Sequence, residues 1–181
     1  DRLEEILKEL RELVETIHRR NEEIVRKVAE LVKRIHDHNE ENTRRVEELV
    51  RRIKDIIRRG NKSSEVLKRA EELIKRSEED LRRSVRDAER LIRELKEEVK
   101  KTVEDAKRLA KRVKEMLDRT VDSEDVERAK RDVDRLLKEL EESSERVLRT
   151  IEKLLKELRE SSKRVRDETK RLLDELREAV R

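Results

Sequence analysis

The chain has 181 residues, of which 55% are charged and 32% hydrophobic, and it contains no aromatic residue, no proline and no cysteine. The lack of cysteine excludes disulfides, thiol nucleophiles and cysteine-based metal sites, and no apolar run is long enough to span a membrane. Its 52 basic and 48 acidic residues give a formal net charge of +4; because the two signs alternate and no aromatic side chain can stack on a base, we expect no nucleic-acid partner.

The first predicted helix spans residues 2–59. Its apolar side chains, from Leu3 to Ile57, recur mostly every three or four residues, which is the spacing of one face of an α-helix. The low hydrophobic content would by itself suggest disorder, but the strict periodicity outweighs it. Gly60, the single glycine, and Asn61 then predict a left-handed helix cap followed by a turn.

The second and third predicted helices span residues 64–118 and 123–180. Asp122 or Ser123 is a suitable N-cap for the third helix. Because the loops are only a few residues long, consecutive helices must run antiparallel. We therefore predict an all-α fold, a straight antiparallel up-down-up three-helix bundle that forms a single domain over residues 1–181. Each helix should have nearly 60 residues, which is about 87 Å at 1.5 Å per residue.

Apolar residues also repeat at a fixed interval of 18 residues, which is five helical turns. Five turns at 3.6 residues per turn bring each set back to the same side of its helix. This period lies between the heptad and hendecad repeats that impose opposite supercoils, so the helices should run nearly straight. With so few apolar residues, nearly all of them must face inward. The apolar stripes include Leu13, Leu31 and Leu49 in the first helix, Leu73 and Leu91 in the second, and Leu136, Leu154 and Leu172 in the third.

Polar side chains interrupt these stripes at matching levels. His18 and Asn21 recur one five-turn interval later as His36 and Asn39. If the first turn centres on residue 61, residue n of the first helix lies level with about residue 122 − n of the second, and a second turn near residue 121 extends this register to the third helix. The resulting layers are His18, Asn21, Thr102, Ser143 and Ser144; then His36, Asn39, Ser84, Ser161 and Ser162; and then Asn42, Thr43, Ser77 and Thr169.

The coincidence in level predicts hydrogen-bond networks that cross between the helices. An unpartnered buried amide or hydroxyl costs about 1–3 kcal/mol, and leaving all of these groups unmatched would exceed the stability of a typical fold. A slipped register would place polar groups against leucine and valine, so such networks would also penalise incorrect packing.

On these residues the whole chain resembles de novo designed helical bundles with modular hydrogen-bond networks. The resemblance rests on the fixed-period repeats, the Glu/Lys/Arg surface, the lack of aromatic residues and proline, and the Ser/Thr/Asn/His layers. Members of that class serve as scaffolds, as halves of orthogonal heterodimers and, where histidines are buried, as pH-responsive assemblies. The resemblance implies these roles as expectations for this chain.

His18 and His36 lie at the edge of the first helix's stripe and admit two interpretations. If they occupy a dry site, protonation would add a charge and turn both ring nitrogens into donors, and stability would fall below about pH 6. The alternative is a boundary histidine that completes a network or lies at its wet edge, and we favour it because a switch requires burial.

The histidines and the paired serines indicate neither a metal site nor a catalytic site. His36 and His38 are separated by a single residue and point to different sides of a helix, without the spacing of zinc-binding motifs. The Ser143-Ser144 and Ser161-Ser162 pairs could lie near histidine, but catalysis also needs an orienting acid, an oxyanion site and a cleft. We expect no enzyme activity, no metal, no cofactor and no small-molecule partner.

The favoured interpretation is a monomeric designed scaffold whose packing is specified by the polar layers. Two alternatives stay open. The first is an interaction protein, with three helices of a four-helix bundle that accepts one helical partner. The second is a pH-dependent homo-oligomer that associates through its histidine edge.

Overall fold

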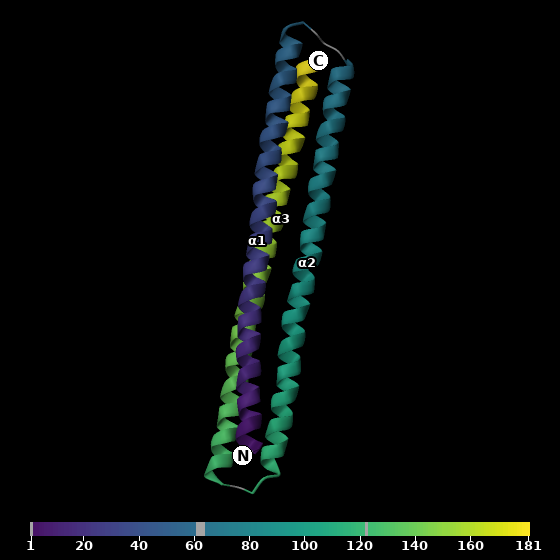
Figure 1. Ribbon diagram of the computed structural model, residues 1–181. Helices are drawn as coiled ribbons and strands as arrows, with labels where there is room; N and C mark the ends of the chain where they lie inside the picture. The colour runs from purple at the N-terminus through teal and green to yellow at the C-terminus, as the bar shows by residue number, and fades with distance from the viewer. Residues whose placement is uncertain (1, 61–63, 122) are drawn as a thin grey trace. The chain divides into compact units, whose positions relative to one another are not determined.

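A computed structural model of the chain describes residues 2–60, 64–121 and 123–181. It contains three α-helices: α1 spans Arg2–Arg58, α2 spans Ser64–Asp118 and α3 spans Glu124–Val180 (Figure 1). The predicted all-α class and three-helix organisation are confirmed, and each helix limit agrees with the expected one or differs from it by a single position. The candidate turn and cap residues Asn61 and Asp122 lie outside the described residues.

Two local features explain where helices end and begin. Gly60 has a φ of 95°, a left-handed conformation that glycine adopts without the steric cost of a Cβ atom, and its backbone N–H donates to the Ile57 carbonyl at 3.0 Å. At the start of α3, the Val126 N–H donates to the Ser123 hydroxyl at 3.3 Å. Ser123 is therefore the N-cap of α3, one of the two candidates predicted.

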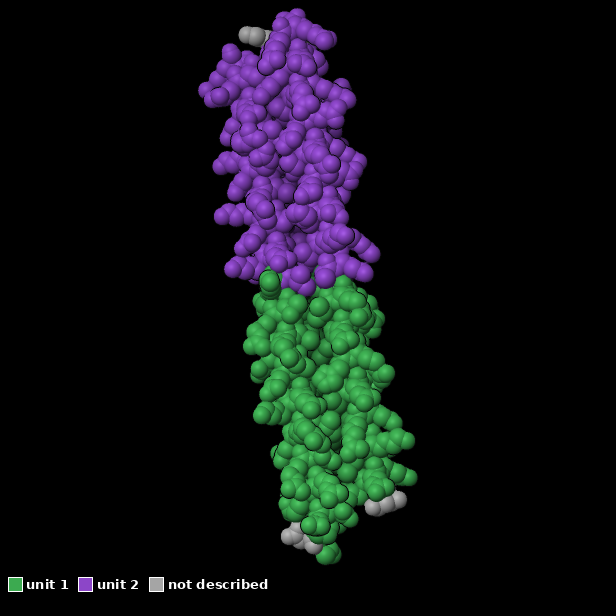
Figure 2. All heavy atoms as spheres, turned by 90° about the vertical axis from the view of Figure 1, so that its left-hand side faces the viewer, with its two compact units in different colours: residues 1–28, 92–153 green, residues 29–91, 154–181 purple. Residues whose placement is uncertain are grey.

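The chain divides into two compact units (Figure 2). Unit 1 comprises residues 1–28 and 92–153, and unit 2 comprises residues 29–91 and 154–181. Each unit contains a segment of all three helices, so each has a three-helix core of its own. The predictions of a single domain over the whole chain and of helices that are straight over their full length stay predictions.

The core of unit 1 gives the relative direction of its helices. This core has two clusters of buried side chains, which are listed at the end of this paragraph. From the first cluster to the second, the residue numbers rise along α1 and α3 and fall along α2. The α2 helix therefore runs antiparallel to the other two, as an up-down-up bundle requires. Full burial of each leucine, isoleucine or valine in such a core contributes about 1.5–3 kcal/mol. One cluster contains Leu7, Leu10, Ala110, Val113, Leu117, Val126, Ala129 and Val133, and the next contains Val14, Ile17, Val103, Ala106 and Leu140.

The core of unit 2 is built in the same way. The small Ala70 on α2 lets the neighbouring helices approach it, and larger side chains from α1 and α3 fill the remaining space. Its main cluster contains Val46, Val50, Ile53, Ala70, Ile74, Leu172, Leu173 and Leu176.

The prediction that nearly all apolar side chains face inward is wrong along one side of unit 2. Leu73 is 54% exposed, Leu91 45% and Ile56 37%. At about 100° per residue, Leu73 and Leu91 lie on the flank of the α2 stripe that faces α1 and away from the centre of its buried face. These three residues, together with the partly buried Leu31 and Leu49, are called the α1–α2 edge below.

Candidate functional site

The first polar layer lies in unit 1, where His18 of α1 and Ser143 of α3 are in hydrogen-bond contact. His18 Nδ1 lies 3.0 Å from Ser143 Oγ, and the Ser143 hydroxyl donates to the Leu140 carbonyl of its own helix at 3.2 Å. With its only proton used in that way, Ser143 accepts a hydrogen bond from His18 Nδ1–H. Thr102 donates within α2, to the Val99 carbonyl at 3.1 Å, and has no hydrogen bond to a described residue of α1 or α3.

Two polar side chains of this layer are buried and have no hydrogen-bond partner among the described residues. Asn21 is 2% exposed and Ser144 is 4% exposed. Neither the amide nitrogen nor the amide oxygen of Asn21, nor the Ser144 hydroxyl, has a hydrogen-bond partner among the described residues. The structure thus differs from the predicted network at Asn21, Thr102 and Ser144. Through the residues that the structure describes, the layer is joined between α1 and α3 and not to α2, and Asn21 bears a desolvation cost that no hydrogen bond among them offsets.

The second layer, in unit 2, repeats the first with an additional contact. His36 Nδ1 lies 3.1 Å from Ser161 Oγ, and Asn39 Nδ2 donates to the same hydroxyl oxygen at 3.4 Å. Ser162 donates to the Leu158 carbonyl of its own helix at 2.9 Å. Ser84 makes no hydrogen bond with another described side chain, so α2 does not contribute to this layer either.

The third layer, also in unit 2, is the one in which α2 takes part. The Ser77 hydroxyl donates to Asn42 Oδ1 across the helices. Thr43 donates to the Asn39 carbonyl within α1 at 2.9 Å. Thr169 is 3% exposed and makes no hydrogen bond to α1 or α2 in the part of the chain that is described. The three predicted layers therefore contain cross-helix hydrogen bonds, but none of them joins all three helices through the described residues.

His36 is a boundary residue with partners on both ring nitrogens. Its side chain is 44% exposed, and its Nε2 lies 3.0 Å from Glu40 Oε1, one helical turn away. The dry surroundings that a pH switch would need are absent at this position. When protonated, the ring would donate from Nδ1 to Ser161 and from Nε2 to Glu40, so both donors face acceptors. His38 is exposed.

The sequence of contacts from Ser161 to His36 to Glu40 is the order of nucleophile, base and acid in hydrolases. The surroundings do not suit that chemistry. Ser161 is only 7% exposed, and it lies in the interior of α3, where the backbone N–H groups are used in the helix and cannot serve as oxyanion donors. Among the described residues, no three His, Cys, Asp or Glu side chains are grouped so as to hold a metal ion.

Ion pairs surround the core at the borders between helices. Arg20 contacts Glu98 through two hydrogen bonds, of 2.9 and 3.2 Å, and this interaction raises the pKa of Arg20. Lys54 pairs with Glu175 at 3.0 Å and Arg177 with Glu71 at 2.9 Å. Exposed pairs of this kind contribute about 0–1 kcal/mol each, so they favour the observed neighbours without dominating stability.

The lowered pKa values of two carboxylates predict how the stability of the folded chain responds to acid. The pKa of Glu23 is lowered by hydrogen bonding to Lys27 and to Arg20, and the pKa of Glu168 is lowered by its hydrogen bonds from Arg171. A lowered folded-state pKa contributes stability above the usual value near 4.5, and that stability is lost as the pH falls below it. Urea midpoints should therefore decline from about pH 4.5 downward.

The control for this prediction removes the two groups. A variant carrying Glu23→Gln and Glu168→Gln should show a shallower decline in the urea midpoint over the same range. Identical pH dependence in the variant and the parent protein would show that these carboxylates do not contribute.

Comparisons with known proteins place few limits on the chain. It matches no protein-family model and no curated protein. Among solved structures, it is similar to a computationally designed three-helix bundle, with 24% sequence identity and a TM-score of 0.48 over 99% of this chain and 89% of that one. No helix in the described part of the chain is long and apolar enough to cross a membrane.

Proposed function

We propose that the chain is a designed structural scaffold, a monomer with no natural biochemical activity, whose helix register is set by polar side chains in its core. The observation that supports this proposal most directly is the recurrence of the His–Ser contact. The pairs His18 with Ser143 and His36 with Ser161 are related by the same five-turn step on both helices, and their distances are 3.0 and 3.1 Å. A contact repeated at a fixed period is typical of a structural element used twice, whereas a catalytic or binding site needs to occur only once.

The mass of the particle in solution tests the proposal. Light scattering at pH 7.4 and at pH 4.5 should give 22.0 kDa, the mass of one chain, over the whole accessible concentration range. A larger mass at pH 7.4 that falls to one chain at pH 4.5 would instead support a pH-dependent homo-oligomer that associates through its histidine edge.

A second candidate function is an interaction protein, and the α1–α2 edge is the observation that favours it. Leu73 and Leu91 are about half exposed and lie on the same side of α2, where an amphipathic helix of a partner could bury them. In that case an amphipathic helical peptide should bind the free chain at this edge. A Leu73→Lys, Leu91→Lys variant should lose that binding, whereas a parent protein that binds no such peptide would favour the scaffold.

A further inference from the structure

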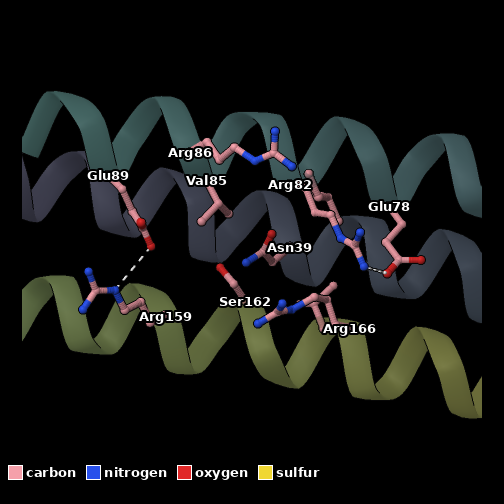
Figure 3. A pocket seen from close by; sticks show the side chains of 11 residues that line it. Asn39, Glu78, Arg82, Val85, Arg86, Glu89, Arg159, Ser162 and Arg166 are labelled. Atoms are coloured by element: carbon pink, nitrogen blue, oxygen red, sulfur yellow. Dashed lines mark hydrogen bonds and ion pairs between the residues drawn. The ribbon is translucent and has the colours of Figure 1, made fainter.

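Unit 2 contains a hollow on the border between α2 and α3 that none of the roles above uses. Its volume is about 370 Å³, within the range of small-ligand pockets. Figure 3 shows Asn39 and Ser162 at its floor and arginine side chains from both helices around it. Leu81, Val85 and Val165 supply an apolar lining. The hollow thus combines an apolar wall, a polar floor and a charged rim.

The charges of the rim favour an anion. Four arginines and two glutamates line the hollow. Arg82 pairs with Glu78 at 3.0 Å and Arg159 pairs with Glu89 at 3.5 Å. Arg86 and Arg166 form no ion pair with any residue that the structure describes. Two guanidinium groups are therefore available, and a guanidinium binds carboxylate, sulfonate or phosphate oxygens through directed hydrogen bonds.

The floor of the hollow also has unused hydrogen-bonding capacity. Asn39 is 1% exposed and donates from Nδ2 to Ser161, but its Oδ1 accepts no hydrogen bond from the described side chains. That oxygen is not among the buried side-chain atoms that lack a partner, so a ligand in the hollow can donate a hydroxyl or N–H group to it.

The five-turn repeat allows the hollow to be compared with the corresponding site in unit 1. In unit 1, Ser144 corresponds to Ser162 and Leu148 corresponds to Arg166. Ser144 is 4% exposed, whereas Ser162 is only partly buried and lines the hollow. Leu148 and Arg166 each follow their serine at the i+4 position and so lie over the same helix face. The serine followed by the partly buried Leu148 is therefore closed off from solvent, and the serine followed by the exposed Arg166 lines the hollow.

We propose that this hollow binds a small amphipathic organic anion, with the apolar body against Val85 and Val165 and the anionic group between Arg86 and Arg166. This goes beyond the scaffold function and differs from the expectation of no small-molecule partner. The apolar lining excludes a fully hydrated inorganic ion as the preferred ligand, because such an ion would leave the lining unused.

The full-length chain can be titrated with 8-anilinonaphthalene-1-sulfonate and its fluorescence followed, with the uncharged N-phenyl-1-naphthylamine as a parallel probe. Arg166→Leu, which copies the leucine of unit 1, and Arg86→Glu should each raise the Kd of the sulfonate at least about tenfold, the loss of one charge-assisted contact. Arg83→Leu makes the same change in composition at an exposed position outside the hollow and should leave the Kd within about twofold.

Circular dichroism of each variant establishes that the helices are intact. A Kd that stays unchanged in either Arg166→Leu or Arg86→Glu would overturn the proposal, as would equal affinity for the uncharged probe. Equal weakening by Arg83→Leu would also overturn it, because it would indicate attraction to net charge and not to this hollow.

Discussion

Replacing Asn21 by leucine is expected to stabilise the protein by about 1–3 kcal/mol. Asn21 is 2% exposed and neither atom of its amide has a partner among the described residues, so the folded state bears a desolvation cost with no compensating hydrogen bond. Leucine belongs to the residue types that form the surrounding core and brings no polar atom to desolvate. Urea unfolding followed by circular dichroism at the helix minimum would measure the difference in the free energy of unfolding.

The repeat supplies a matched control for this substitution. Asn39 occupies the corresponding position in unit 2 and donates to Ser161 at 3.4 Å. Asn39→Leu removes that bond as well as the buried amide, so its gain should be smaller than that of Asn21→Leu. Equal effects of the two substitutions, or a loss of stability in Asn21→Leu, would show that the Asn21 amide is satisfied in solution.

Truncating Leu158 to alanine is expected to cost about 2–5 kcal/mol, the usual range for a fully buried leucine. Leu158 is 0% exposed, so the substitution removes apolar contacts and leaves a cavity that neighbouring side chains can only partly fill. Thermal and urea unfolding should both report the loss. Because typical domains are stable by only about 5–15 kcal/mol, this one change removes a large part of the total.

Leu73→Ala is the control for a leucine on the same kind of apolar stripe. Leu73 is 54% exposed, so most of its surface already contacts water and truncation should cost less than about 1 kcal/mol. If both truncations cost the same, the division between the core and the α1–α2 edge would not hold in solution.

The fold was predictable because strong signals of one kind cover the chain. The apolar period specifies three helices, and the left-handed Gly60 and the capping Ser123 indicate where α1 ends and α3 begins. Leu73 and Leu91 were assigned wrongly for a geometric reason. A stripe drawn on one helix does not reveal which of its flanks a neighbouring helix covers.

The level of each polar side chain along its helix was predictable from the sequence, but its hydrogen-bond partner was less so. Registers derived from the turns placed His18 beside Ser143 and His36 beside Ser161, and the distances agree. They did not reveal that Ser162, like Thr102, donates to a carbonyl of its own helix. A hydroxyl in a helix can donate to a carbonyl of its own helix at every position. Its level alone therefore cannot decide whether it forms a hydrogen bond to another helix.

In the sequence, the hollow coincides with a break in the apolar five-turn repeat of the third helix. Arg166 stands where the repeat has Leu148 in unit 1. A single charged residue on the flank of an apolar stripe is common on any helix surface, so the break alone does not predict a cavity. Only the packing of α2 against α3 shows that the apolar wall and the polar floor meet beneath it.

A double-mutant cycle between His36 and Ser161 tests most directly whether polar side chains of equal level bond across the helices. His36→Ala, Ser161→Ala and the double variant should give a coupling energy of about 0.5–1.5 kcal/mol, the contribution of one hydrogen bond between contacting residues. The same cycle with Thr169→Ala, two helical turns farther along α3, should be additive. A coupling near zero for His36 with Ser161, or an equal coupling with Thr169, would contradict this account of the bundle.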